Sequence, residues 1–365
     1  MSNKSKIIFY YSIIFVLIFT FFIIMFEIIV PKIIDIPHVV YRYWENRPVT
    51  YHPNLRNRAV TNSYDNYFKT NSLGFKDIEH NISDKSNYRI LLLGDSYVEA
   101  EGVDPKQHMA RNIEDLGKKN QKNIEVISMG QSGWGQAHHL ATYERIGRFF
   151  NPDLVITFFC TNDLHDNNRN ENTTMGNPPM PIYTIENNKL ILRLPEKERP
   201  LTLKEMILRK LNKLETYHIV RYIYKKIYYN FLVPQEDLNI ADLLTSNDQT
   251  PELTIEDWAS DDDFDYFYLI LDKMKEDIVK RDNAKLISVI VSGGLNEEMH
   301  QTYFEYLKKV EETFVDKGIK TINFDRIFRE QYKETGILPH WEKDAHWNEL
   351  GHQMVAKILY DELLK

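Results

Sequence analysis

The sequence has very little cysteine and more acidic than basic side chains. Cys160 is the only cysteine in 365 residues, so no disulfide can form within the chain, and cysteine usage neither favours nor excludes an oxidising compartment. Lys and Arg number 45 against 53 Asp and Glu, and the net charge of -8 argues against general affinity for nucleic acid. No internal repeat or low-complexity tract is present. We therefore expect no nucleic-acid partner.

The composition is otherwise that of a globular protein. Hydrophobic residues make up 43% of the chain, aromatic residues 13% and charged residues 27%, which is enough apolar mass for a sizeable core. A single large α/β domain with insertions could absorb nearly all of the length.

A long uncharged segment lies near the N-terminus. No charged residue occurs from Ile7 to Phe26, and about 20 apolar residues in a helix match the ~30 Å hydrocarbon core of a bilayer. We therefore predict a cytoplasmic tail at 1–6 and a transmembrane anchor at 7–30. A cleaved signal peptide is the alternative, although its apolar part would be shorter and would end in small residues.

The orientation of this single-pass anchor is less strongly indicated. Lys4 and Lys6 precede the span, whereas Lys32, Arg42 and Arg47 follow it, so basic residues flank both ends. The very short leading tail favours an N-terminus inside the cell and a soluble domain outside the cytoplasm.

Five short apolar runs follow a polar lead-in segment at 31–87, which contains a loop with a glycine turn, TNSLGFKD. Strands that are apolar on successive residues and separated by helix-length segments predict a parallel sheet covered on both faces. The fold class is therefore α/β, a three-layer α/β/α sandwich within 88–365. The expected strands are RILLLG, IEVISMG, DLVITFFC, AKLISVIV and IKTINF, and helices are expected near 138–150, 264–281, 297–317 and 349–364.

The connection between the third and fourth strands is too long for an ordinary loop, so residues 164–259 are predicted to form an insertion. Within it, PIYTIENNKLILRL predicts a β-hairpin, and LKEMILRKLNKLETYHIVRYIYKKIYYNFL predicts one or two helices. These helices could cover the site, contact the membrane surface or join a partner, and packing on the domain is the default expectation. The acidic run EDWASDDDFD indicates a solvated loop or a helix start.

Three predicted strands end in residues suited to acyl chemistry. Ser96 follows the first strand in GDS, at the carboxyl edge where parallel sheets bind ligands. Its hydroxyl could attack an acyl carbonyl if a base removed the proton. Gly133 follows the second strand in SGWG, and Asn162 follows the third in TND. The N–H groups of Ser96 and Gly133 and the Asn162 amide could together form an oxyanion hole.

A candidate base lies near the C-terminus in DAHWN. Asp344 could hold one imidazole nitrogen of His346 while the serine contacts the other. Asn348 is then expected to be the N-cap of the last helix.

These blocks, in this order, resemble the SGNH branch of the GDSL esterase and lipase superfamily. The four signature residues of the family would be Ser96, Gly133, Asn162 and His346, with Asp344 as the carboxylate. The resemblance covers about residue 89 to the C-terminus apart from the insertion, and TNSLGFKD looks like the approach segment of membrane-anchored members. It implies a flavodoxin-like sheet and a serine esterase.

The chain departs from the family pattern at two positions. Cys160 stands where the third block usually begins with glycine. The last block is Asp344-Ala345-His346 rather than Asp-x-x-His, a spacing that resembles relatives of polysaccharide O-acetyltransferases.

Other polar residues near the blocks have simpler interpretations. Asp95 and Asp163 are expected to be structural hydrogen-bond partners, and Cys160 a buried, inert thiol. The side chains of TNDLHDN have no standard zinc or calcium spacing, so we expect no metal and no cofactor. A structural or surface role is expected for five further histidines, His138, His139, His165, His340 and His352.

The leading functional interpretation is an esterase that forms an acyl-serine intermediate on acyl esters. The anchor and the resemblance together suggest O-acetyl esters of an envelope or surface glycan as its substrates. The first alternative is an O-acyltransferase that acetylates such a glycan with an acyl group from a multi-spanning partner. A noncatalytic glycan-binding or assembly protein is the second alternative.

Overall fold

The computed structural model describes residues 3–33, 41–42, 47–61, 63–83, 85–167, 182–187, 189–193, 203–211, 214–227, 255–291, 301–342 and 344–364. The chain forms two compact units. One comprises Met1–Val39 with Arg199–Pro234, and the other comprises Val40–Glu198 with Gln235–Lys365.

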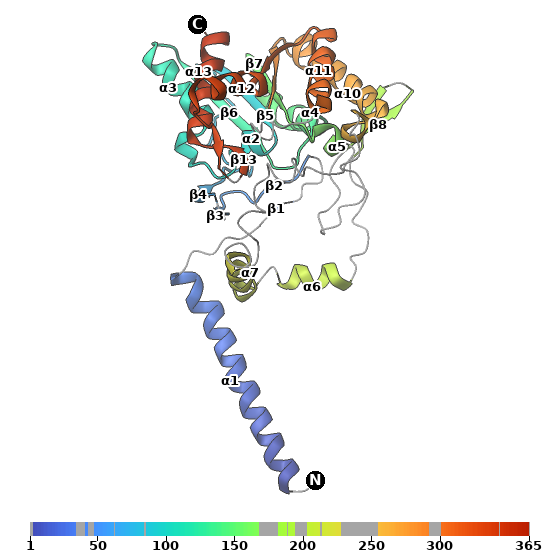
Figure 1. The fold of residues 1–365 in the computed structure, drawn as a ribbon. Helices are drawn as coiled ribbons and strands as arrows, with labels where there is room; N and C mark the ends of the chain where they lie inside the picture. The colour runs from blue at the N-terminus through green and yellow to red at the C-terminus, as the bar shows by residue number, and fades with distance from the viewer. Residues whose placement is uncertain are drawn as a thin grey trace. The chain divides into compact units, whose positions relative to one another are not determined.

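The larger unit is built on a five-stranded parallel sheet, and all five strands predicted from the sequence are present (Figure 1). The strand order is β11-β10-β7-β5-β6. In chain order this is the flavodoxin-like arrangement 2-1-3-4-5, in which the order of strand addition reverses between the first and third strands. The strands are β5 (Tyr88–Gly94), β6 (Ile124–Gly130), β7 (Leu154–Phe159), β10 (Lys285–Ile290) and β11 (Lys320–Asn323).

Helices cover both faces of the sheet, which makes the unit a three-layer α/β/α sandwich. Alternate residues of β5 enter opposite cores, because successive side chains of a strand point to opposite faces: Leu91 and Leu93 lie in one core, and Ile90 and Leu92 lie in the other. The first core is completed by α4 (Gln136–Arg145), α10 (Asp261–Met274) and α11 (Gln301–Asp316), and the second by α3 (Met109–Lys119), α12 (Phe324–Thr335) and α13 (Glu349–Leu363).

The helix boundaries differ from the expected ones for local reasons. Helix α10 begins at Asp261 because Ser260 caps it and Asp263 bonds back to the Ser260 N–H, and π-helical turns at Lys275–Arg281 continue it. Helix α4 ends at Arg145, before a 3₁₀ turn at Gly147–Phe150. The expected start of α11 at 297–300 lies outside the described residues. Helices α3 and α12 were not among those expected from the sequence.

The lead-in segment is more ordered than its sequence suggests. It contains β2 (Thr50–Tyr51), which pairs with β1 (Tyr41–Arg42), and a hairpin of β3 (Arg56–Val60) and β4 (Asp65–Lys69). The glycine turn predicted in TNSLGFKD is confirmed, because Gly74 has a φ of 89°.

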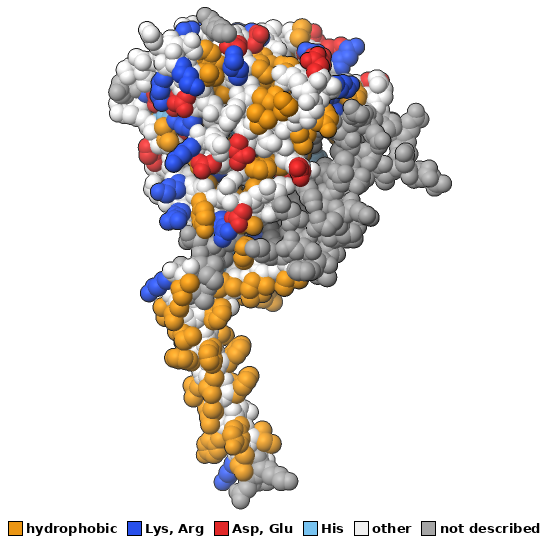
Figure 2. Space-filling model, turned by 60° about the vertical axis from the view of Figure 1, so that its left-hand side comes forward, with side chains coloured by type: hydrophobic (Ala, Val, Ile, Leu, Met, Phe, Trp, Pro, Cys, Tyr) orange, Lys and Arg blue, Asp and Glu red, His pale blue; other side chains and the backbone are white. Residues whose placement is uncertain are grey.

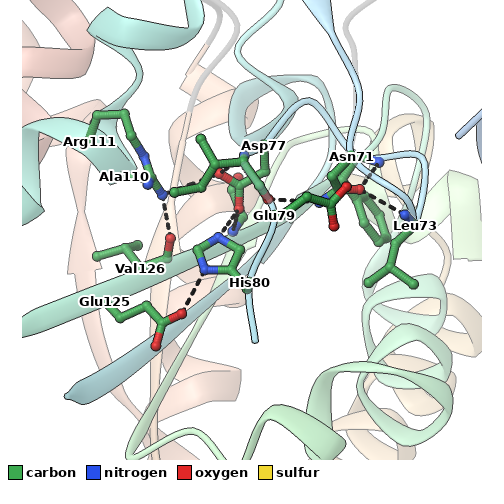
Figure 3. Close-up of polar contacts among 12 residues, drawn as sticks. Asn71, Leu73, Asp77, Glu79, His80, Ala110, Arg111, Glu125 and Val126 are labelled. Carbon is green, nitrogen blue, oxygen red and sulfur yellow. Dashed lines mark hydrogen bonds and ion pairs between the residues drawn. The ribbon is translucent and has the colours of Figure 1, made fainter. Parts of the chain in front are cut away.

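A buried polar network joins the lead-in segment to the sandwich (Figure 3). The His80 ring lies between Asp77 and Glu125, at 2.9 Å and 2.8 Å. Asp77 also accepts hydrogen bonds from Arg111 on α3 and from the Ser128 N–H on β6. Burial raises the pKa of Asp77, but the bond from His80 and the charge of Arg111 outweigh it and hold the pKa below its usual value.

The hairpin predicted inside the insertion is confirmed as β8 (Ile182–Glu186) and β9 (Lys189–Arg193). Tyr183 of β8 is buried in the first core, donates to Glu144 and accepts at its carbonyl from Tyr266. The short elements of this unit are α2 (Ser96–Glu99), α5 (Asp163–Asn167), α9 (Ile255–Trp258), β12 (His340–Trp341) and β13 (Asp344–Trp347).

The smaller unit contains α1 (Asn3–Ile33), α6 (Leu203–Leu211) and α7 (Glu215–Ile227). Within α1, Ser5–Ile29 is long and apolar enough to cross a membrane, and its hydrophobic side chains are exposed along the helix (Figure 2). The insertion helices were expected by default to pack on the sheet domain. The structure instead groups α6 and α7 with α1, where two backbone N–H groups of α7 donate to Glu27.

Candidate active site

The site lies at the carboxyl edge of the sheet, at the point where the order of the strands reverses. Strand β5 lies between β6 and β7, so the residues that follow these three strands flank one another. Ser96 begins α2 directly after β5, and the Asp95 side chain caps this short helix by accepting from the Tyr97 N–H at 3.0 Å. The cap fixes the start of α2 and therefore the direction of the Ser96 side chain.

The structure brings Ser96, His346 and Asp344 into one hydrogen-bonded chain. His346 Nε2 lies 2.7 Å from Ser96 Oγ, and His346 Nδ1 lies 2.5 Å from Asp344 Oδ1. When Nδ1 is protonated and donates a hydrogen bond to Asp344, Nε2 is unprotonated and can accept the proton of the serine hydroxyl. The 250 residues between serine and histidine thus close into the arrangement that the sequence blocks predicted.

The elements around His346 hold it in place. Strand β13 carries Asp344 and His346 and pairs with β12. The Tyr97 hydroxyl donates to the Ala345 carbonyl at 2.8 Å, which ties α2 to β13. Asn348 accepts from the Gly351 N–H, so the predicted N-cap of α13 is confirmed.

The charges around the imidazole favour its protonated form. Burial lowers the pKa of His346, but the hydrogen bond to Asp344 and the charges of Glu101, Asp344 and Asp95 outweigh it and raise the pKa to about 9. Burial raises the pKa of Asp344, but the bond and charge of His346 outweigh it and lower the pKa below its usual value. Asp344 therefore remains ionised at neutral pH and stabilises an imidazolium.

The two other predicted oxyanion donors follow the strands on either side of β5. Gly133 lies in the turn after β6 and has a φ of 75°, a conformation that favours glycine. Asn162 lies between β7 and α5 and is exposed. Its side-chain amide donates one hydrogen to Asp166. An amide carries two hydrogens, so the second is available to a ligand.

Two carboxylates close to Ser96, those of Glu99 and Glu101, were not predicted from the sequence to belong to the site. Glu101 Oε2 lies 3.9 Å from His346 Nε2 and accepts from the Ser132 hydroxyl at 3.0 Å, while Glu101 Oε1 accepts from the Tyr64 hydroxyl at 3.1 Å. Glu99 accepts from the Ser132 N–H at 2.7 Å, directly before Gly133. Both occur in SYVEAEG, and their position a few residues after Ser96 could have indicated that they lie near the site.

Glu99 is held from the lead-in segment as well. It accepts from the Tyr51 hydroxyl at 2.8 Å, and Lys76 Nζ lies 3.9 Å away. Lys76 also donates to the carbonyl of Ala100, the C-cap of α2. Burial raises the pKa of Glu99 despite the opposing charge of Lys76. The Ser96 helix, the Gly133 turn and the lead-in segment therefore share one buried polar cluster.

The remaining polar residues take structural contacts. Asp163 accepts from Gln136, and the Gly135 N–H donates to His138. Cys160 is buried, and burial together with the charge of Asp95 raises the pKa of its thiol well above the usual value, as expected of an inert thiol.

Comparison with known proteins gives similar structures only. No protein-family model and no curated protein matches the sequence. Among solved structures, an acetyl xylan esterase is similar at 12% identity and a TM-score of 0.43, over 76% of this chain and 100% of that one. A lipase/acylhydrolase from Enterococcus faecalis matches at 14% identity and a TM-score of 0.39, over 75% and 94% of the two chains. The structure of TesA matches at 12% identity and a TM-score of 0.40, over 76% of this chain and 98% of that one.

Proposed function

We propose that this protein is a membrane-anchored serine esterase of the SGNH type that cleaves acyl esters, O-acetyl esters above all. The observation that carries the proposal is the chain of hydrogen bonds from Asp344 through His346 to Ser96, with distances of 2.5 and 2.7 Å. A nucleophile, a base and a carboxylate that orients the base are the parts that serine acyl transfer requires.

The reaction proceeds through an acyl-serine. Ser96 Oγ attacks the ester carbonyl carbon while His346 Nε2 accepts the hydroxyl proton. The carbonyl oxygen becomes an oxyanion, which receives hydrogen bonds from the N–H groups of Ser96 and Gly133 and from the Asn162 amide. The C–O bond of the ester then breaks, and His346 returns the proton to the departing alcohol. A water molecule repeats the sequence on the acyl-serine and releases the acid.

The apolar helix supports the membrane part of the proposal. The uncharged stretch from Ile7 to Phe26 spans the hydrocarbon core, with the N-terminal tail inside and the esterase domain outside the cytoplasm, facing envelope or surface glycans. Carbonate extraction of membranes tests the anchor: a retained helix keeps the full-length chain in the pellet, and a cleaved signal sequence leaves a shorter, extractable chain.

Transfer to a sugar hydroxyl is the second candidate, favoured by the Asp344-Ala345-His346 spacing. The same residues would act, and the acceptor hydroxyl would replace water in the second step. An acetyl donor and a deacetylated glycan, followed by mass analysis of the glycan, separate the two reactions. Acetylated product supports transfer, and free acetate alone supports hydrolysis.

Replacement of Ser96 tests the nucleophile. Ser96→Ala is expected to lower turnover of an activated acetyl ester by on the order of 10⁶, because loss of the nucleophile removes the acyl intermediate. Ser83→Ala is the matched control, since Ser83 is an exposed serine of the lead-in segment that is not part of the site. Turnover that survives in Ser96→Ala would support a noncatalytic fold or another nucleophile.

A further inference from the structure

The helices α6 and α7 each expose an apolar face. In α7 the exposed fractions are 60% for Val220, 49% for Ile223 and 46% for Ile227. These positions follow the spacing i, i+3, i+7, which places them on one side of a helix. In α6, Leu203 and Ile207 are exposed at 70% and 49% and lie one helical turn apart. His218 lies about 160° around the helix from Val220 and is buried, so the opposite side of α7 is occupied; Ile219, one turn before Ile223, is buried at the edge of the apolar face.

A contact with α1 determines where α7 begins. The backbone N–H groups of Glu215 and Thr216 donate to the two carboxylate oxygens of Glu27, at 2.7 and 2.8 Å. Glu27 is thus an N-terminal cap for α7, supplied by another helix, and its negative charge faces the positive end of the α7 dipole. The first turn of α7 is therefore fixed to the C-terminal end of α1.

The position of Glu27 places that contact at a membrane boundary. Glu27 lies two residues before the end of the apolar span Ser5–Ile29. At a rise of about 1.5 Å per residue, this is about 3 Å from the end of the span. A carboxylate near the bilayer is costly unless it is paired or hydrogen-bonded, and the two N–H groups of α7 supply those bonds.

The charge of this segment suits the surface of an anionic bilayer. Residues 203–227 contain seven Lys or Arg and two Glu, in a chain whose overall net charge is -8. A basic segment with an apolar face is the composition of helices that lie in the membrane interface. Each Lys or Arg near an anionic surface strengthens the binding of such a segment.

We propose that α6 and α7 lie in the interface of the bilayer that α1 spans, with their apolar faces on the acyl chains and basic side chains among anionic headgroups. The proposal rests on the membrane anchoring proposed above. The occupant of the exposed apolar face is thus lipid, and the pairing of α7 with Glu27 fixes its depth. The chain would then bind the membrane in two ways, through the spanning helix α1 and through α6 and α7, which lie along the bilayer surface.

The test measures depth at single labelled positions of the full-length protein, reconstituted in vesicles of phosphatidylethanolamine and phosphatidylglycerol. Spin labels are placed at Ile223→Cys on the apolar face of α7, at Arg221→Cys as the matched control, and at Ile18→Cys in the middle of α1. Arg221 lies two residues from Ile223, about 200° around the helix. The native Cys160 is buried and does not compete for the label.

The expected result is a label at Ile223 about 5–10 Å below the headgroup boundary, accessible to oxygen and shielded from an aqueous nickel complex. The Arg221 label is expected above that boundary, and the Ile18 label in the hydrocarbon core. A label at Ile223 as accessible to nickel as the one at Arg221, with Ile18 still shielded, overturns the proposal and leaves the anchor in place. Shielding of Ile223 from both reagents indicates a protein partner or second copy and also overturns it.

Two further outcomes complete the test. Water access at Ile18 overturns the anchor and this proposal together, whereas ester turnover reports separately on the proposed chemistry. Glu27→Ala removes the cap and is expected to move the Ile223 label several Å toward water, by about the depth of one helical turn. Glu27→Gln retains an acceptor oxygen and is expected to keep most of that depth. An unchanged depth in Glu27→Ala contradicts the role given to Glu27.

Discussion

The pH dependence of catalysis gives the most direct test of the site, because His346 must be neutral to accept the serine proton. Its pKa of about 9 means that roughly one molecule in a hundred has a neutral imidazole at pH 7. We expect kcat/KM on a soluble acetyl ester to rise with pH and to reach its plateau above about pH 9, because this parameter reports the ionisation of the free enzyme.

Glu101→Gln isolates the contribution of the neighbouring carboxylate. The charge of Glu101 lies 3.9 Å from His346 Nε2, and a pair at this separation interacts by about 1 kcal/mol in water and about 4 kcal/mol at an effective dielectric constant of 20. About a third of the Glu101 side chain is exposed, so the lower part of this range applies. A change of one unit in pKa corresponds to about 1.4 kcal/mol.

We therefore expect Glu101→Gln to lower the kinetic pKa by about one unit and to raise kcat/KM at pH 7 about tenfold, with an unchanged plateau. The control is Asp115→Asn, which removes one negative charge from a side chain that is 61% exposed on α3. A wild-type profile with its midpoint near 6.5, or a midpoint unmoved by Glu101→Gln, would refute the reasoning. An equal shift in Asp115→Asn would assign the effect to net charge.

Four other substitutions test the rest of the larger unit. Asp344→Asn is expected to lower kcat by on the order of 10⁴, measured at saturating ester, because the amide cannot orient the imidazole and stabilise its charge. Asn162→Ala is expected to cost about 10²–10³ in kcat if its amide binds the oxyanion, and an unchanged kcat would remove it from that role. Gly130→Ala places a methyl group against the backbone of Val98 and Glu99, so denaturant unfolding should show a loss of about 1–3 kcal/mol. Lys76→Leu leaves the buried Glu99 without its cation and is expected to cost about 3–5 kcal/mol in the same assay.

The parallel sheet was predictable from the sequence because each strand is buried on both faces, whereas a flavodoxin-like arrangement was expected only from the family resemblance. The run ILLLG of β5 has no polar residue to interrupt it, and helix-length segments separate the strands. The two helices that were not predicted, α3 and α12, have weaker sequence patterns. Of the 12 residues of α12, six are charged, and only Phe324, Asp325 and Phe328 are buried, so its apolar pattern is short.

The ordered structure of the lead-in segment could not be predicted because it depends on contacts with residues far away in the sequence. The contacts of Asp77 and His80 reach residues 34 to 51 positions away on α3 and β6. No local periodicity encodes such pairs, since polar side chains are ordinarily evidence of a solvated loop. For the same reason the role of Lys76 could not be predicted, since its partners are Glu99 and the Ala100 carbonyl.

The proximity of Ser96, Asp344 and His346 was predictable from the sequence, but the environment of the imidazole was not. Ser96, Asp344 and His346 belong to short blocks whose residue types indicate their chemistry. The basicity of the imidazole depends additionally on Glu101, which accepts from Tyr64 of the lead-in segment and from Ser132, the residue before Gly133. A residue that binds Glu101 thus acts on His346 without touching it. Any substitution that moves the lead-in segment away from Glu101 should therefore change the pH profile of the reaction, even where the triad distances are preserved.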